Sequence, residues 1–304
     1  MVRIRYKLGL VVNPQLSTSP SRGLVKAAAR IRKGLMLLKI FTAAFVVLGL
    51  TAAAPAPIWR ALNPENTLII ETTKGRIIVE MAPALAPLAV ARVRLLSREG
   101  VYDGLQFHRV IDHFVDQTGN PNNRDGGASS HPDLPPEFTF RIAPDLFMSV
   151  RQAGDGQQGF VGATPVEAVS LAEAARSPDR KLRGWGVYCP GVVGMGRQVD
   201  PGTANSEIFL MRDAARRLDH DYTVWGRVVI GRDVVRAMNV GEPPSNPDKM
   251  LQVRVASDLD SPPRVEIMDT HGPGLKALVH KMRRAKGADF TICDIEIPAR
   301  IANP

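Results

Sequence analysis

One short stretch of the chain combines a permanent cation, an aromatic ring and a neutral amide. Arg109 lies in the apolar run Phe107–Ile111, and Phe114 and Gln117 belong to a second run, Phe114–Gln117. A cation within such a run must be paired or in use if it is buried. The three groups together suit an uncharged ligand rich in carbonyls, such as a peptide. The alternative is an arginine on an edge strand that points into water.

The surrounding sequence predicts the elements that position these residues. The two runs read as short strands joined by a turn at Asp112-His113. Upstream, the β-branched runs 67–72 and 76–81 flank Lys74-Gly75, which predicts a β-hairpin. A helix is expected from the Pro83–Pro87 region to about Ser97, because apolar residues recur there at helical spacing.

These motifs resemble the cyclophilin signature. Phe107-His108-Arg109, with Tyr102-Asp103-Gly104 before it and the Phe114–Gly119 segment after it, is similar to the Phe-His-Arg and Phe-Met-x-Gln-Gly-Gly elements of that family. Four further segments resemble later family motifs in the family's order: 134–138, 191–196, 202–210 and 218–228. The chain is identified as a member of the cyclophilin-type peptidyl-prolyl isomerases over about residues 67–240.

The resemblance implies a mainly β fold: a closed antiparallel β-barrel capped by helices. We expect residues 57–304 to form this single domain. The motifs are interrupted by about fifty extra residues, so an insertion is expected at about 141–188, with a loop at Gln152–Gly159 and a helix at Val166–Arg176.

A C-terminal extension is expected at about 241–304. It would hold a strand at Arg264–Met268, a helix at about Leu275–Lys286 and a strand at Phe290–Ile297. The last of these strands could close the barrel.

The resemblance also implies a set of site residues. Arg109 would donate a hydrogen bond to the prolyl nitrogen, and Gln117 would bond to the peptide backbone. The proline pocket would be lined by four apolar residues, namely Phe114, Val115, Phe209 and Leu218, and Tyr222 stands where the family has His or Tyr. No metal and no cofactor is expected, because the histidines and cysteines show no zinc-ligand spacing.

Three positions depart from the family pattern. Val115 replaces the usual Met, Glu207 replaces the usual Gln, and Arg217 stands where an aromatic residue is common. A carboxylate at Glu207 close to Arg109 could orient the guanidinium or compete for its donors, and the sequence leaves both open.

The predicted function is peptidyl-prolyl cis-trans isomerisation of proline-containing polypeptides during folding. A peptide-binding chaperone with little turnover is the alternative, favoured by Val115 and Glu207. A third interpretation is a scaffold that uses the insertion as its contact surface.

The charge distribution argues against nucleic-acid binding. Of 39 basic and 30 acidic residues, nine basic and no acidic ones precede residue 57, so the remainder of the chain carries 30 of each. The net charge of +9 therefore belongs to the N-terminus.

Residues 1–56 are typical of an export signal. Basic residues up to Lys39 precede the apolar run Ile40–Leu50, and small residues follow. The expected location is periplasmic or secreted, with a start possibly at Met36. A retained membrane anchor and a mitochondrial-type transit segment are the alternatives. Cys189 and Cys293 are compatible with one disulfide or with two buried thiols.

Overall fold

The computed structural model describes residues 56–302. The chain divides into two units, residues 1–51 and 52–304, and every element below belongs to the second. The predicted export signal, the start at Met36 and the apolar run Ile40–Leu50 lie outside the described residues. No helix within residues 56–302 has both the length and the apolar character required to cross a bilayer.

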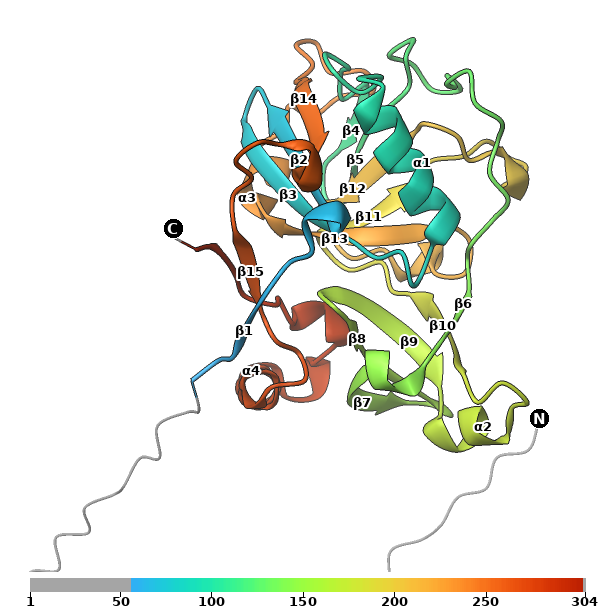
Figure 1. Ribbon diagram of the computed structural model, residues 1–304, viewed down its shortest axis with the longest axis vertical. Helices are drawn as coiled ribbons and strands as arrows, with labels where there is room; N and C mark the ends of the chain where they lie inside the picture. Colours follow the sequence, from blue (N-terminus) through green and yellow to red (C-terminus); the bar gives the residue numbers. More distant parts are fainter. Residues whose placement is uncertain (1–55, 303–304) are drawn as a thin grey trace, which may run out of the picture. The chain divides into compact units, whose positions relative to one another are not determined.

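An eight-stranded antiparallel sheet forms the larger part of this unit (Figure 1). Its strands, in spatial order, are β14 (Met250–Val255), β2 (Thr67–Thr72), β3 (Gly75–Met81), β13 (Val224–Ile230), β11 (Val192–Met195), β12 (Ile208–Met211), β5 (Val115–Thr118) and β4 (Arg109–Ile111). The predicted hairpin 67–81 and the paired runs around Arg109 and Gln117 are confirmed as β2–β3 and β4–β5.

The two edges of this sheet meet and close it into a barrel. Gln106 and Lys249 form an isolated antiparallel bridge, and so do Val110 and Gly241. The amide of Phe107 donates to the carbonyl of Asp248 at 2.9 Å. Closure removes the exposed strand edges that would otherwise template aggregation. The predicted fold class, a cyclophilin-like barrel with helices, is confirmed.

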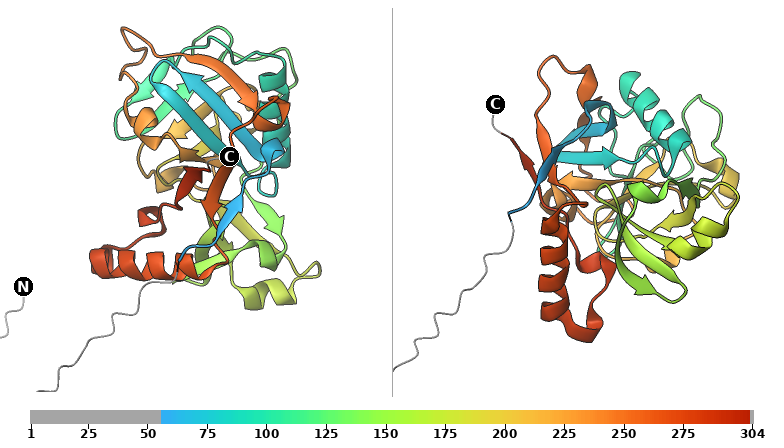
Figure 2. Two further views of the ribbon diagram at one scale, coloured as in Figure 1. Left: turned by 60° about the vertical axis from the view of Figure 1, so that its left-hand side comes forward. Right: turned by 60° about the horizontal axis from the view of Figure 1, so that its bottom comes forward.

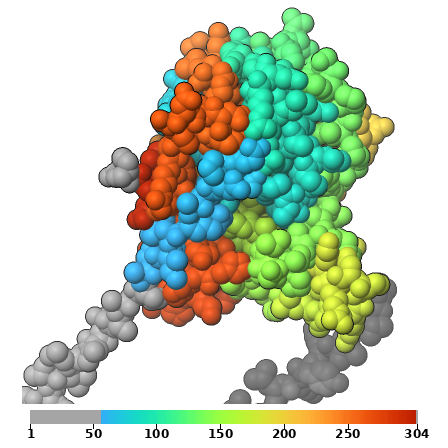
Figure 3. Space-filling view, viewed as in Figure 1, coloured from blue at the N-terminus to red at the C-terminus, as the bar shows by residue number. Residues whose placement is uncertain are grey.

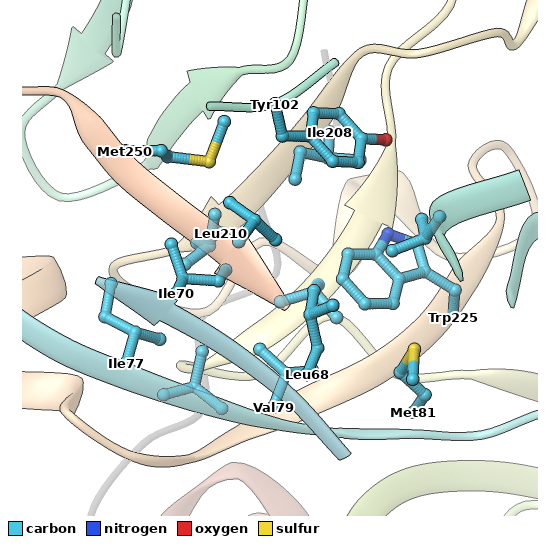
Figure 4. Close-up of a cluster of buried hydrophobic side chains, with 14 of the residues drawn as sticks. Leu68, Ile70, Ile77, Val79, Met81, Tyr102, Ile208, Leu210, Trp225 and Met250 are labelled. Carbon is cyan, nitrogen blue, oxygen red and sulfur yellow. The ribbon is translucent and has the colours of Figure 1, made fainter. Parts of the chain in front are cut away.

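Successive residues on each barrel strand alternate between the interior and the outer face, as the period of a β-strand requires. On β3, Ile77 and Val79 pack inside the barrel, whereas Ile78 packs outside it. Figure 4 shows the interior side chains, among them Leu68, Leu210 and Trp225. The site described below lies on the outer face.

Two helices contribute buried residues to the barrel interior. Helix α1 (Pro87–Arg98) inserts apolar residues such as Val90, and α3 (Arg232–Arg236) inserts Val235. The Glu137 carboxylate accepts hydrogen bonds from the first free amides of α1, those of Leu88 at 3.0 Å and Ala89 at 2.9 Å. Glu137 thereby caps the helix, because Ala86 at the N-cap position has no side-chain oxygen to accept from these amides.

A second, five-stranded sheet is made only from residues 140–186. Its spatial order is β6 (Phe140–Ile142), β10 (Leu182–Gly186), β9 (Thr164–Val169), β8 (Gly156–Val161) and β7 (Met148–Ala153). A third sheet joins the two ends of the described chain: β1 (Trp59–Ala61), β15 (Val265–Met268) and β16 (Ala299–Ile301). Figure 3 shows this N-terminal segment in blue against the orange-red C-terminal residues.

Two sequence predictions within residues 140–186 were wrong. The expected loop Gln152–Gly159 is a hairpin of β7 and β8, because its polar residues are satisfied across strands: Gln158 donates to Glu167 at 2.6 Å. The expected helix Val166–Arg176 begins as strand β9 and becomes helix α2 only at Leu171–Arg176, after Ser170 caps it.

The prediction that Phe290–Ile297 forms the closing strand of the barrel was also wrong. That segment contains one 3₁₀ turn, Ile292–Asp294, and β14 takes the position beside β2. Its apolar residues, including Phe290 and Ile295, are buried against the outer face of the barrel without strand pairing. The expected helix at Leu275–Lys286 is present as α4 (Pro273–Lys286).

Polar contacts and a disulfide fasten these outer elements to the barrel. The buried guanidinium of Arg227 on β13 donates to the carbonyls of Ala163 at 3.1 Å and Ile295 at 3.2 Å. Cys189 and Cys293 form a disulfide, so the choice that the sequence left open is decided in favour of the bond. Both views of Figure 2 show α4 beside the strands β7 and β8, and Arg283 donates to the carbonyl of Val150 at 2.7 Å.

Candidate active site

Strand register places the chemistry-bearing residues in one row on the outer face of the barrel. Arg109 on β4 is paired with Gln117 on β5, and Gln117 is paired with Phe209 on β12. Phe209 is in turn paired with Gly194 on β11. Because paired residues point to the same face, strands β4, β5 and β12 present an arginine, an amide and an aromatic ring side by side, and β11 adds Gly194 next to the ring. A side chain at Gly194 would collide with the Phe209 ring, so glycine makes room for it.

A pocket of about 410 Å³ opens beside this row. Among its lining residues are all eight residues that the sequence predicted: Arg109, Phe114, Val115, Gln117, Glu207, Phe209, Leu218 and Tyr222. The structure therefore brings together groups that are up to 113 residues apart (222 − 109) in the chain.

The apolar part of the pocket is held by aromatic packing. Phe209 stacks on Tyr188 with ring centroids 5.7 Å apart, and Tyr222 meets Phe209 edge-on at 5.8 Å. Both distances fall within the favourable range for aromatic pairs. Phe209 is buried except for 5 % of its surface, so the ring of a bound proline would meet a fixed apolar wall.

Two residues hold the Arg109 guanidinium. Nη1 donates to Oε1 of Gln117 at 2.8 Å, and Nε donates to Oε2 of Glu242 at 2.7 Å. Among residues 56–302, no protein group accepts a hydrogen bond from Nη2. An arginine fixed at two nitrogens therefore has one nitrogen left to donate to a ligand.

The possible ion pair between Glu207 and Arg109 is not formed. The carboxylate of Glu207 instead accepts hydrogen bonds from the amides of Gln117 and Asn120. It faces Gly196, where any side chain would overlap the carboxylate. Glu207 therefore contacts Arg109 through Gln117, which bonds to both, and the ion-pair partner of Arg109 is Glu242.

Burial dominates the electrostatics of Glu207. Desolvation raises its pKa to about 7, and the negative Asp125 adds to this, while the bonds from Asn120 and Gln117 act in the opposite direction. Nearby His108 is 4 % exposed, and burial lowers its pKa, although Asp125 favours the protonated form.

Sequence reasoning missed several lining residues. Asp125 comes from the polar loop Asn122–His131, and Arg197 and Gln198 follow β11 directly. Glu242, which holds Arg109, follows the last recognisable motif. Arg197 could have been suspected, because it extends the 191–196 motif toward the pocket; Asp125 and Glu242 carry no local signal.

Two arginines place their guanidinium groups over aromatic rings at the pocket. The Arg197 guanidinium carbon is 4.4 Å from the ring centroid of Tyr222, and this arginine also pairs with Asp221. The Arg217 guanidinium carbon is 4.4 Å from the ring centroid of Phe114. Both distances are typical of cation–π contacts.

Comparisons with known proteins agree with this geometry. Residues 67–257 match the family model described as cyclophilin type peptidyl-prolyl cis-trans isomerase/CLD. The chain is 33% identical over 232 residues to a probable peptidyl-prolyl cis-trans isomerase of Brucella suis, covering 71% of this chain and 94% of that protein. It is 28% identical to peptidyl-prolyl cis-trans isomerase B of Bacillus subtilis, over 60% of this chain and 91% of that protein.

A solved structure extends the similarity beyond the barrel. The crystal structure of cyclophilin AquaCyp293 from Hirschia baltica is similar with a TM-score of 0.73 and 34% identity, covering 80% of this chain and 92% of that one. The match to the family model covers well over half of the chain. The chain belongs to the cyclophilin-type peptidyl-prolyl cis-trans isomerases, and its reaction is the interconversion of cis and trans X-Pro bonds.

Proposed function

We propose that Arg109 catalyses this isomerisation by donating a hydrogen bond from Nη2 to the prolyl nitrogen of a polypeptide bound in the 410 Å³ pocket. The observation that carries the proposal is the clamping of Arg109 by Gln117 and Glu242, which leaves Nη2 available beside an apolar wall.

The physical reason lies in the prolyl amide bond. Its rotation is slow because the C–N bond has partial double-bond character, with a barrier of roughly 18–20 kcal/mol. Twisting the bond localises a lone pair on nitrogen. A donor aimed at that nitrogen binds the twisted amide better than either planar form, and such selective binding lowers the barrier.

The apolar wall supports this donor. Phe114, Val115, Phe209 and Leu218 would hold the proline ring and exclude water, which strengthens the hydrogen bond from Arg109. Val115 gives a shallower wall than the methionine usual in the family. Gln117 would contact the peptide backbone.

Isomerisation of a short X-Pro peptide tests the proposal with three variants. Arg109→Ala should lower kcat/KM at least tenfold, equivalent to about 1.4 kcal/mol of transition-state stabilisation. Arg109→Lys should not restore activity, because an ammonium lacks the planar fork. Arg141→Ala is the matched control and should remain active, because it removes an exposed arginine on β6 that pairs with Asp179 away from the pocket.

A fully active Arg109→Ala protein would refute the proposed role of the arginine. A wild type that leaves the uncatalysed rate unchanged would favour the alternative, a peptide-binding chaperone.

The same proposal includes export and proline-containing client proteins in an oxidising compartment. Two observations support it: the basic and apolar pattern of residues 1–56, and the Cys189–Cys293 disulfide, a bond typical of exported proteins. Fractionation of cells that express the full gene should place the protein outside the cytoplasm, with residues before about 57 removed. Mass spectrometry that finds an intact Met1 in a cytoplasmic product would contradict export.

A further inference from the structure

A buried carboxylate beside the pocket lacks a permanent cationic partner. Glu207 is 6 % exposed, and among residues 56–302 only the imidazole of His108 approaches it as an ion-pair partner, with Nε2 to Oε2 at 3.8 Å. Arg109 is held by Glu242 instead. A buried charge without a partner is costly, so a bound cation would be stabilised here.

Three residues that could bind a metal ion converge at this point. His108 Nε2 lies 3.2 Å from Oδ1 of Asp125, and the donor atoms of His108, Asp125 and Glu207 all lie within 4.8 Å of one another. In a tetrahedral zinc site with bonds of about 2.0–2.1 Å, neighbouring ligands are about 3.4 Å apart. The separations from Nε2 to the carboxylate oxygens of Asp125 and Glu207, 3.2 and 3.8 Å, lie on either side of that value.

The loop that carries Asp125 is fixed at both ends. Near its start, the backbone N–H of Gln106 donates to Oδ1 of Asn123 at 2.8 Å. Toward its end, Asn205 accepts from the amide of Ser129 at 2.9 Å and donates to the carbonyl of His131 at 2.8 Å. The Asp125 side chain is 66 % exposed, so an ion could enter from the pocket side.

The geometry points to a site for a divalent transition-metal cation, zinc by ligand type, formed by His108 Nε2, Asp125 and Glu207 with water in the fourth position. One imidazole and two carboxylates suit zinc better than magnesium or calcium, which prefer oxygen ligands alone. Gln117 donates to both carboxylates and would remain in contact with the ligands from outside.

Occupancy would inhibit the isomerase, a consequence that rests on the proposed role of the pocket. Asp125, Glu207 and Gln117 all line the pocket, and Gln117 also holds Arg109. A zinc ion with its water would fill part of the space for the peptide and would place positive charge near the guanidinium. Zinc should therefore compete with substrate and raise KM.

Direct binding tests the site independently of catalysis. Tag-free protein is first freed of metal with a chelator. Its zinc affinity is then measured by competition with a chromophoric chelator, and cobalt is bound in place of zinc because its absorption bands report tetrahedral coordination. We expect one ion per chain and at least a tenfold weaker affinity in Asp125→Asn, where an amide oxygen replaces the carboxylate. Glu207→Gln should weaken binding similarly.

His113→Gln is the matched control. The His113 imidazole lies on the surface, 2.8 Å from Asp213 and 3.5 Å from Asp112, and so presents another histidine beside two carboxylates. It should leave the zinc affinity unchanged. Loss of binding in His113→Gln with retention in Asp125→Asn would overturn the assignment, as would the absence of binding at micromolar zinc. If zinc binds but does not inhibit isomerisation, the metal site is supported and only its proposed competition with the substrate is contradicted.

Discussion

Glu242 accepts a hydrogen bond from Nε of Arg109 at 2.7 Å, although 133 residues separate them in the chain. The contact exists because the barrel closes at this point: the backbone of Val110 bridges to Gly241. The same closure that removes the sheet edges therefore supplies the carboxylate that orients the guanidinium.

Removal of this carboxylate should impair catalysis without unfolding the protein. We expect Glu242→Gln to lower kcat/KM about threefold to tenfold. The neutral amide oxygen accepts a weaker hydrogen bond from Nε than the carboxylate does, so the guanidinium spends less time aimed at the substrate. The measurement is isomerisation of a short X-Pro peptide.

Glu296→Gln is the control for Glu242→Gln. It removes the exposed carboxylate that pairs with Arg232 at 2.6 Å, outside the pocket lining. Equal activities in the two variants would show that Glu242 does not position Arg109.

Glu207 should make activity depend on pH through Gln117. Both amide hydrogens of Gln117 are taken, one by Glu207 and one by Asp125 at 3.0 Å. An ionised Glu207 holds the amide most strongly and keeps it from a substrate carbonyl. Glu207→Gln should therefore raise kcat/KM above pH 7.

The sign follows from the raised pKa of Glu207, about 7. As the pH falls through 7, the carboxylate of Glu207 in the wild type gains a proton, and the hydrogen bond that it accepts from the Gln117 amide weakens. The activity ratio of Glu207→Gln to wild type should thus be largest above pH 7 and approach one near pH 6. Profiles are recorded with a chelator present, and parallel curves would show that the two side chains do not communicate.

Arg217 should bias the choice of substrate. Its guanidinium covers Phe114, its side chain is exposed, and within residues 56–302 it has no carboxylate partner within 4 Å. We expect peptides with Glu beside the proline to react about twofold to fivefold faster than those with Lys, the size of an exposed charge interaction. Arg217→Gln should reduce that preference while a neutral peptide changes little. An unchanged preference would exclude this role.

The Cys189–Cys293 disulfide should stabilise the fold. It closes a loop of 104 residues and ties the end of the 140–186 region to the C-terminal segment. Chain entropy gives an upper limit of about 4.7 kcal/mol for such a loop. Reductant or Cys293→Ser should lower Tm by several degrees. Because neither cysteine lines the pocket, isomerisation at 25 °C should persist; a Tm insensitive to reductant would contradict the stabilising role.

The sequence alone, through its resemblance to the cyclophilin family, determined the barrel and eight of the residues that line the pocket. Local patterns carry this information: β-branched runs around Lys74-Gly75 specify a hairpin, and motif order specifies which residues share a face. All eight predicted residues consequently line one pocket. The sequence also located the 140–186 region, although it assigned a loop and a helix where strands β7, β8 and β9 form.

Tertiary structure alone decided the electrostatics and the closing contacts. The carboxylate that binds Arg109 is Glu242 and not Glu207, because strand closure sets that distance and no local pattern encodes it. The pKa of Glu207 depends on burial by other segments. The apolar residues of Phe290–Ile297 are compatible with either a strand or a turn. Because β14 pairs with β2, no strand position is left there for this segment, and it instead packs as a turn against the outer face of the barrel.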